Sequence, residues 1–206
     1  MTGTTITPYL FFGGPRVPNK GGTKMMRRFV ALVLVLTLLP ALPLASYGDG
    51  QPGAKVPAPP TNAGLEKMKK LAGTWLAADK DGKPTDQVVS IIKVTAGGSA
   101  VHETLFPGQP HEMISVYTAD GPDLIMTHYC VLGNQPRMKA DPKSPPNQIV
   151  FRFAGGTNLN PEKDKHMHEA TLTIVSDDRI EVSGTGWENG APAKDMCCGL
   201  KLVRKK

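Results

Sequence analysis

Residues 87–106 have the sequence QVVSIIKVTAGGSAVHETLF, and this stretch decides the fold class. Two runs rich in β-branched residues flank the turn residues Ala96-Gly97-Gly98. Successive side chains of a strand point to opposite faces, and adjacent glycines permit a tight reversal of the chain. The stretch therefore predicts an antiparallel hairpin with one face turned toward a core.

The same pattern extends along the chain on both sides of this hairpin. Short β-rich runs alternate with turn residues, among them Asp120-Gly121-Pro122 and Asp177-Asp178, and no long helical period interrupts them. This organisation is typical of an all-β, antiparallel domain and argues against βαβ units. Strands are expected near residues 74–78, 87–95, 99–106, 111–118, 123–132, 148–153, 167–175, 179–187 and 196–203. Two long loops are expected at 133–147 and 154–165.

A short helix is expected before the first strand. Residues 49–60 are rich in Pro and Gly and predict a linker, so the folded domain should comprise residues 61–206. Thr61 or Asn62 can cap a helix, and Gly73 can end it. The apolar residues that fall on one face of this helix are Leu65, Met68, Leu71 and Ala72.

Residues 25–48 have the pattern of a secretory signal peptide. Arg27 and Arg28 precede an apolar run at 29–39, which is shorter than the ~20 residues that a membrane-spanning helix needs. Small residues favour cleavage after Gly48 or one to three residues earlier, and an uncleaved anchor or a buried core helix is the alternative. We expect a periplasmic or extracellular product with no stable membrane anchor after cleavage. Residues 1–24, which precede this leader, are expected to be a start-site artefact or a disordered tail.

The net charge of the chain belongs mostly to the leader. The whole chain has 24 Lys and Arg against 18 Asp and Glu, a net charge of +6. Five of the basic residues and none of the acidic ones lie in residues 1–48, which leaves 19 against 18, or +1. A nucleic-acid-binding protein needs a clustered basic face, so the expected partner is not a nucleic acid.

Three cysteines follow the leader, Cys130, Cys197 and Cys198. Export would place them in an oxidising compartment, where an odd number allows at most one internal bridge. Cys130 could pair with Cys197 or Cys198, or all three could stay unbridged. Their spacing does not match a zinc-finger pattern.

The segment Leu71-Ala72-Gly73-Thr74-Trp75, together with Arg204 at the end of the last expected strand, resembles the calycin superfamily. Its lipocalin branch begins with Gly-x-Trp and packs the Trp under an Arg of the final strand. The resemblance implies an up-and-down lipocalin-like barrel in which Trp75 and Arg204 have a structural role. A guanidinium over an indole independently gains about 0.5–2 kcal/mol.

Two further segments refine this resemblance. The runs Thr127-His128-Tyr129-Cys130 and Gly133-Asn134-Gln135-Pro136-Arg137-Met138 resemble a group of uncharacterised bacterial lipocalin-like proteins. The nitrobindin-like branch holds haem through a His near its C-terminus. Here the last His is His168, and Cys197, Cys198 and Lys201 occupy the corresponding region. The resemblance therefore does not carry the haem ligand over, and the sequence does not identify a cofactor.

Alternation along the strands places three histidines inside the expected barrel. His128 shares a face with Leu124, Met126 and Cys130, and His166 and His168 share a face with Ala170, Leu172 and Ile174. Inward imidazoles near a barrel mouth are candidate ligand contacts. Alternatively, His166, His168 and His128 form a metal site with Glu169 or Glu103 as a supporting partner. A third possibility is that these histidines are ordinary surface or core residues with satisfied hydrogen bonds.

The first expected loop offers a second set of candidates. Asn134, Gln135 and Arg137 bring several hydrogen-bond donors together, and Arg matches the geometry of carboxylates and phosphates. They could recognise an anionic ligand at the barrel rim. The alternative is a loop in which Asn134 and Gln135 bond to their own backbone.

Catalytic machinery is not evident in the sequence. It has no Gly-x-Ser-x-Gly elbow and no phosphate-binding glycine loop, and His128 and Cys130 are too far apart on a strand for a nucleophile–base pair. We therefore expect an exported, non-enzymatic barrel that binds a small apolar or amphipathic ligand in a cavity of ~300–1,000 Å³. A His-ligated metalloprotein or metalloenzyme is the alternative, and a structural or interaction barrel without ligand is the second.

Overall fold

The computed structural model describes residues 61–206, apart from the side chains of Cys197 and Cys198. The expected tail at 1–24, leader at 25–48 and linker at 49–60 lie outside the described residues. The thiol of Cys130 is free, so the bridge that could have joined Cys130 to Cys197 or Cys198 is not formed. None of the helices in the described part has the length and apolar character that crossing a bilayer requires.

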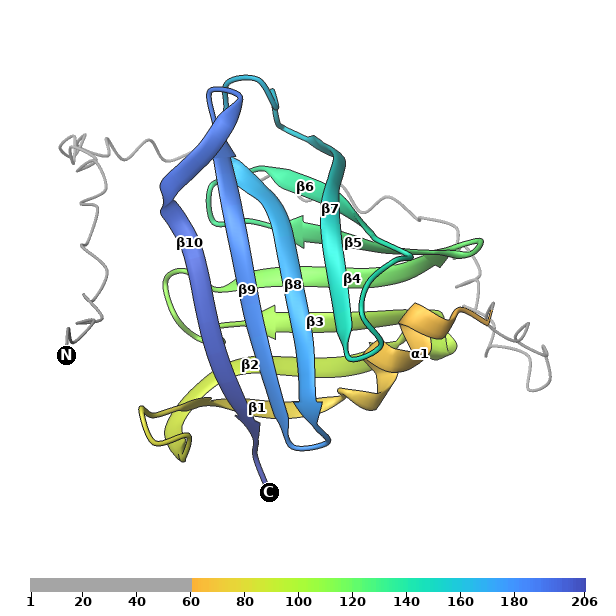
Figure 1. Ribbon diagram of the computed structural model, residues 1–206, viewed down its shortest axis with the longest axis vertical. Coiled ribbons are helices and arrows are strands. Elements are labelled where there is room, and N and C mark those ends of the chain that lie inside the picture. The colour runs from red at the N-terminus through yellow and green to blue at the C-terminus, as the bar shows by residue number, and fades with distance from the viewer. Residues whose placement is uncertain (1–60) are drawn as a thin grey trace, which may run out of the picture. The chain divides into compact units, whose positions relative to one another are not determined.

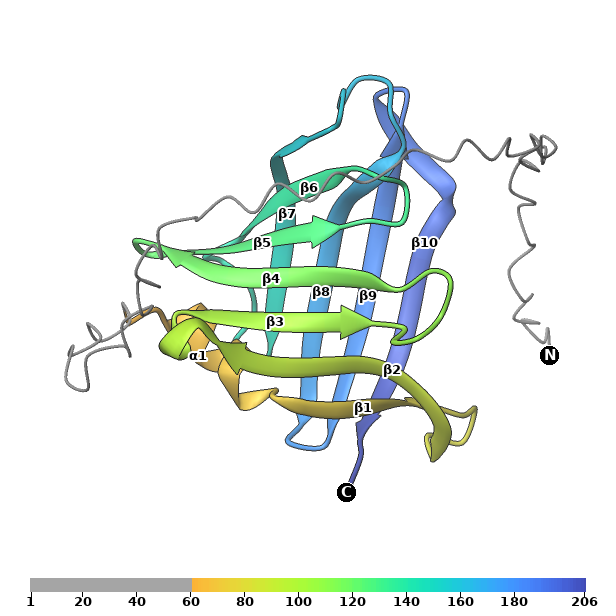
Figure 2. The same cartoon turned by 180° about the vertical axis from the view of Figure 1, so that it is seen from behind.

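The described residues form a closed antiparallel barrel of ten strands (Figure 1). Each strand pairs with the next along the chain, and β1 also pairs with β10, which closes the sheet. The view from behind shows β2 to β5 in front of β7 to β10 (Figure 2). This architecture confirms the expected all-β antiparallel barrel with a short helix. The strands are β1 (Gly73–Ala78), β2 (Pro84–Thr95), β3 (Ala100–Leu105), β4 (Met113–Asp120), β5 (Asp123–Tyr129), β6 (Gln135–Ala140), β7 (Gln148–Thr157), β8 (His166–Ser176), β9 (Arg179–Glu188) and β10 (Ala191–Arg204).

The prediction of a long loop at 133–147 was wrong, because β6 lies within it. Pro136 and Met138 of β6 are buried and alternate with the exposed Arg137, as in any half-buried strand. Pro136 lacks an N–H group, and the register of β6 against β7 shifts between Pro136 and Met138. The second expected loop is shorter than predicted, since β7 continues to Thr157.

The helix α1 (Ala63–Lys70) lies across one end of the barrel (Figure 1). Asn62 caps it by accepting a hydrogen bond from the backbone N–H of Leu65 at 3.0 Å. The Asn62 amide also donates to the carbonyl of Gly121 between β4 and β5, and Lys67 donates to the carbonyl of Pro146 between β6 and β7. Because Leu65 and Met68 are buried, the helix covers the core at this end.

Trp75 and Arg204 meet at the same end, in the arrangement expected from the sequence. They are register partners in β1 and β10, and the Arg204 Cζ lies 4.4 Å from the centroid of the Trp75 ring. The fully buried indole donates from Nε1 to the carbonyl of Leu71 at 2.9 Å. Gly73 has φ +144°, and a Cβ there would lie 2.8 Å from Arg204 Nη1. The positive φ strains any residue that has a Cβ, and the nearby guanidinium leaves little room for one, so both features favour glycine at position 73.

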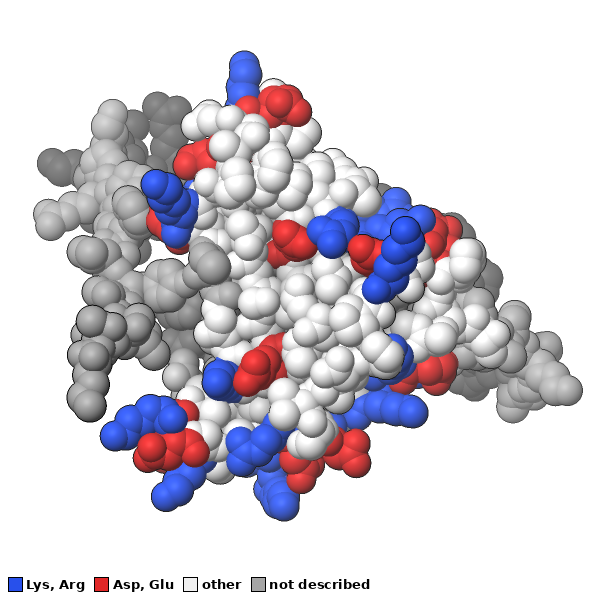
Figure 3. Space-filling model, in the orientation of Figure 1, with Lys and Arg blue, Asp and Glu red and all other residues white. Residues whose placement is uncertain are grey.

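On the face shown in Figure 3, basic and acidic side chains lie side by side rather than in separate patches. Arg152 contacts both Asp141 and Glu169, at 3.1 and 2.8 Å. Lys201 lies 3.6 Å from Glu181. These exposed pairs contribute little to stability, with a typical range of about 0–1 kcal/mol each.

Candidate functional site

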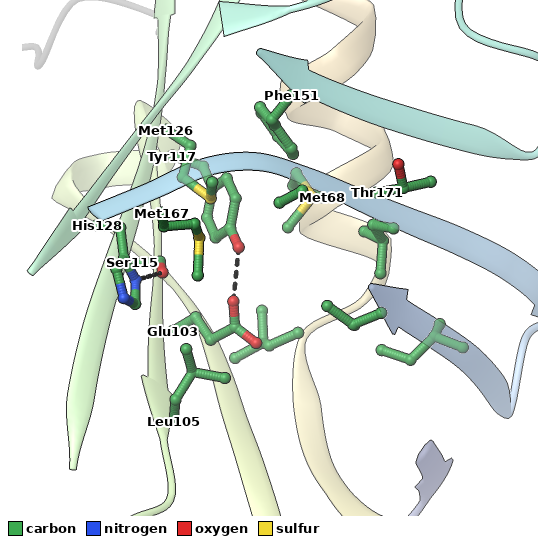
Figure 4. A pocket seen from close by; sticks show the side chains of 15 residues that line it. Met68, Glu103, Leu105, Ser115, Tyr117, Met126, His128, Phe151, Met167 and Thr171 are labelled. Carbon is green, nitrogen blue, oxygen red and sulfur yellow. Dashed lines mark hydrogen bonds between the residues drawn. The ribbon is translucent and has the colours of Figure 1, made fainter. Parts of the chain in front are cut away.

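The barrel interior contains a cavity of about 60 Å³, lined mostly by apolar side chains (Figure 4). It is far smaller than the cavity of ~300–1,000 Å³ that was expected from the sequence. Bulky side chains fill the remaining space, among them Met68, Met126, Phe151 and Met167. The polar side chains that line the cavity are Glu103, Ser115, Tyr117, His128 and Thr171.

Glu103 is the acidic group of this cavity. Its Oε1 accepts a hydrogen bond from Ser90 and its Oε2 accepts one from Tyr117, both at 2.6 Å. Burial raises the pKa of Glu103 more than these two hydrogen bonds lower it. Burial also raises the pKa of Tyr117 well above its ordinary value, and the neighbouring Glu103 adds to that rise. The carboxyl group thus keeps its proton to a higher pH than an exposed glutamate does.

His128 lies near the end of β5 in the same cavity wall. Its Nδ1 shares a hydrogen bond of 3.0 Å with Ser115 Oγ, drawn as a dashed line in Figure 4. The side chain is 1% exposed, yet its Nε2 has no hydrogen-bond partner. Burial lowers the pKa of His128 to about 4, so the imidazole is neutral at pH 7.

His166 and His168 lie at the start of β8, away from the cavity lining. They hydrogen-bond to each other, Nε2 to Nδ1, at 3.0 Å, and the Nδ1 of His166 contacts the carbonyl oxygen of Asp164 at 2.7 Å. His168 stacks between Phe153 and Trp187, with centroid distances of 4.9 and 4.0 Å. Burial and the nearby His166 lower the pKa of His168. These two imidazoles therefore belong to an aromatic cluster near one end of the barrel.

The expected shared face of His166, His168 and Ala170 does not hold, because the register of β8 against β9 shifts between Met167 and Glu169. A bulge adds one residue to a strand and interrupts the alternation of side chains. Met167 lines the cavity instead of the two histidines. Within the described residues there is no group of three or more His, Cys, Asp or Glu side chains placed to hold a metal ion.

The three candidates from the expected anion-binding loop have separate partners. Arg137 is exposed and contacts Asp120 at 3.2 Å. Gln135 donates to the carbonyl of Gly133 and accepts from the hydroxyl of Thr157. None of these candidates lines the cavity, so His128 alone of the six expected ligand contacts does so.

Asn134 precedes β6 and is buried. Its amide donates to the carbonyl of Lys165 at 2.8 Å, whereas its Oδ1 has no hydrogen-bond partner. The side chain thus ties the β5–β6 connection to the segment that precedes β8.

Sequence reasoning missed Ser90, Ser115 and Tyr117, and it considered Glu103 only as a supporting partner of a metal. A signal was present in the alternation of side chains. Glu103 shares a strand face with Val101, which is fully buried, and Ser115 shares a face with Tyr117. Polar residues at the inward positions of strands are informative because buried polar groups are uncommon.

A larger hollow of about 430 Å³ lies outside the barrel beside α1. Two of its three basic residues are already engaged: Lys67 donates to a backbone carbonyl, and Arg204 donates to three. Asp178 contacts both Arg204 and Lys206. The interior cavity has the smaller volume, but it is lined by His128, whose buried Nε2 has no partner, and we take it as the candidate site.

In comparisons with known proteins, no family model matches the chain, and no curated protein matches it. The resemblance to the calycin superfamily thus stays a prediction, and the geometry of the barrel interior carries the functional argument.

Proposed function

We propose that this protein binds a small apolar or amphipathic molecule inside its barrel and acts as a carrier or sensor rather than an enzyme. The observation that carries the proposal is the unpartnered Nε2 of His128, buried in the wall of an apolar cavity. A bound molecule with a polar head could contact this atom and place its apolar part among the methionine, leucine and phenylalanine side chains.

Without a ligand, the unpartnered nitrogen lowers the stability of the folded protein. A buried polar atom without a hydrogen bond costs about 1–3 kcal/mol, and most such atoms in folded proteins are paired. A nonpolar residue of similar size at position 128 would avoid this cost. The retained imidazole therefore supports a role in contacting a molecule that enters the cavity.

The size of the cavity suits a small molecule only if its walls can move. Met68, Met126 and Met167 all line it. Methionine is unbranched and flexible, and it fills space in a core while adapting readily to a new neighbour. We expect these side chains to rotate as a ligand enters, which enlarges the cavity without unfolding the barrel.

Titration of the full chain with 1-hexanol tests this proposal. With methionine methyl groups labelled by ¹³C, the resonances of Met126 and Met167 should shift and then saturate as the alcohol fills the cavity. In Ala170→Leu the added side chain occupies the cavity that Ala170 lines, so the apparent affinity should fall at least tenfold. Ala140→Leu is the matched control, because Ala140 packs against the core but does not line the cavity.

Two results would contradict interior binding. One is the absence of saturable shifts in the unmodified protein. The other is equal affinity in the unmodified protein and in Ala170→Leu, which would place the alcohol elsewhere on the surface.

The sequence also supports export and a place in the calycin superfamily, both as parts of this proposal. Residues 25–48 have the charge and apolar pattern of a leader, and Trp75 with Arg204 matches the lipocalin arrangement. Mass spectrometry of the protein from the producing cell should find a mature chain that begins at Asp49 or up to three residues earlier. A mature chain that retains residues 25–48 would refute cleavage of this leader.

A further inference from the structure

We infer that the molecule bound in the barrel is uncharged, so that the cavity takes neutral alcohols or amides and excludes ions of the same shape. This inference rests on the proposed function and specifies the charge of its ligand. Two observations carry it. The described residues place no Lys or Arg in the cavity lining, and the single carboxyl group of the lining already accepts two hydrogen bonds.

The lining offers no cationic partner to an anion. No Lys or Arg side chain in the described part of the chain is buried, and none lines the cavity (Figure 4). Lys67 and Arg204, which lie beside α1, donate to backbone carbonyls instead. The imidazole of His128 adds no charge, because burial lowers its pKa to about 4. A carboxylate or phosphate would therefore lose its hydration inside the barrel without gaining a counter-charge.

The carboxyl group of Glu103 is a poor partner for a cation. Ser90 donates to its Oε1 and Tyr117 donates to its Oε2, both at 2.6 Å, and Figure 4 shows the second of these bonds. Burial raises the pKa of Glu103, which favours the uncharged form of the group. An ammonium ion brings three N–H donors and would compete with the two hydroxyl groups for the same carboxyl oxygens.

A neutral polar head meets neither obstacle. The Nε2 of His128 is buried and has no hydrogen-bond partner. A hydroxyl or primary amide group contains both a donor and an acceptor, so it complements this nitrogen in either tautomer of the imidazole. The apolar part of the molecule then packs among the apolar side chains of the lining, and no charge is buried.

Two pairs of probes with matched shapes test the inference in the full chain at pH 7, with the ¹³C-labelled methionine methyl groups as the readout. Hexanamide and hexanoate differ in charge but hardly in size, and the same holds for 1-hexanol and hexylammonium. Each neutral probe should bind roughly tenfold more tightly than its charged partner, or better. In Ala170→Leu the affinity of both neutral probes should fall roughly tenfold or more, which assigns the preference to the interior.

A lysine placed in the lining should restore binding of the anion. Met167 lines the cavity and is only partly buried, so an unbranched lysine side chain can replace it without being fully enclosed. In Met167→Lys the preference for hexanamide over hexanoate should fall roughly tenfold. Met113→Lys is the matched control, because Met113 is also partly buried but does not line the cavity, and there the preference should stay unchanged.

The outcomes separate this inference from the proposed function. If a charged probe binds as tightly as its neutral partner and Ala170→Leu weakens both, the selection against charge is wrong while interior binding stands. If Met167→Lys folds and leaves the preference unchanged, a missing counter-charge is not its cause and the inference is overturned. If neither neutral probe shows saturable binding to the unmodified protein, the proposed function itself fails. The comparison of probes in the unmodified protein does not depend on the folding of any variant.

Discussion

Replacement of Trp75 by alanine is expected to lower the free energy of unfolding by about 3–5 kcal/mol, the usual range for removing a large aromatic residue from a core. The indole is fully buried and donates to the carbonyl of Leu71. Its loss leaves a cavity at the end of the barrel that α1 covers, and it removes the surface on which the Arg204 guanidinium rests. Urea denaturation followed by far-UV circular dichroism measures the change.

Trp187→Ala is the matched control, because Trp187 is the other tryptophan of the chain. Its ring is partly exposed and stacks on His168 near the opposite end of the barrel. We expect a loss of about 1–2 kcal/mol there, since a half-buried ring gives up less apolar contact. Equal losses in the two variants would contradict the view that Trp75 is the principal anchor of the barrel end.

The strands could be predicted from the sequence where polar and apolar residues alternate regularly. The hairpin of β2 and β3 was predicted because β-branched runs flank Ala96-Gly97-Gly98, and Gly97 indeed has φ +62°. The strand β6 was missed because Pro136 weakens its signal and the run is short. In the barrel, pairing with β5 and β7 supplies the stabilisation that local sequence preference does not.

The candidate site was predictable only in part. Alternation along β5 correctly placed His128 inside, since no register shift separates it from Met126. The same rule failed for His166 and His168, because a bulge in β8 depends on pairing with β9 and leaves no distinct sequence signal. The polar contacts of the cavity also involve four strands, β2 to β5, and they depend on how adjacent strands pair rather than on any single segment.

Acidification should destabilise the protein through His128. The pKa of His128 falls from 6.5 to about 4 on folding, because burial disfavours the imidazolium. Between these two pH values the unfolded chain binds a proton that the folded chain does not. The contribution of His128 to the free energy of unfolding is therefore fully present above pH 6.5 and is lost as the pH falls toward 4. From pH 7.5 to pH 4.5 this one group should remove about 2–3 kcal/mol from the free energy of unfolding.

Glu103 acts in the opposite direction, and the experiment must separate the two groups. Its raised pKa contributes stability at low pH that is lost as the pH rises through the pKa of the folded state.

In His128→Gln the contribution of Glu103 remains while the titration of His128 is gone. Urea denaturation at pH 7.5 and 4.5 should therefore show an acid-induced loss of stability that is smaller by about 2–3 kcal/mol than in the unmodified protein. His111→Gln, an exposed control, should retain the full loss. If His128→Gln loses as much stability on acidification as the unmodified protein does, the imidazole is not held neutral by burial.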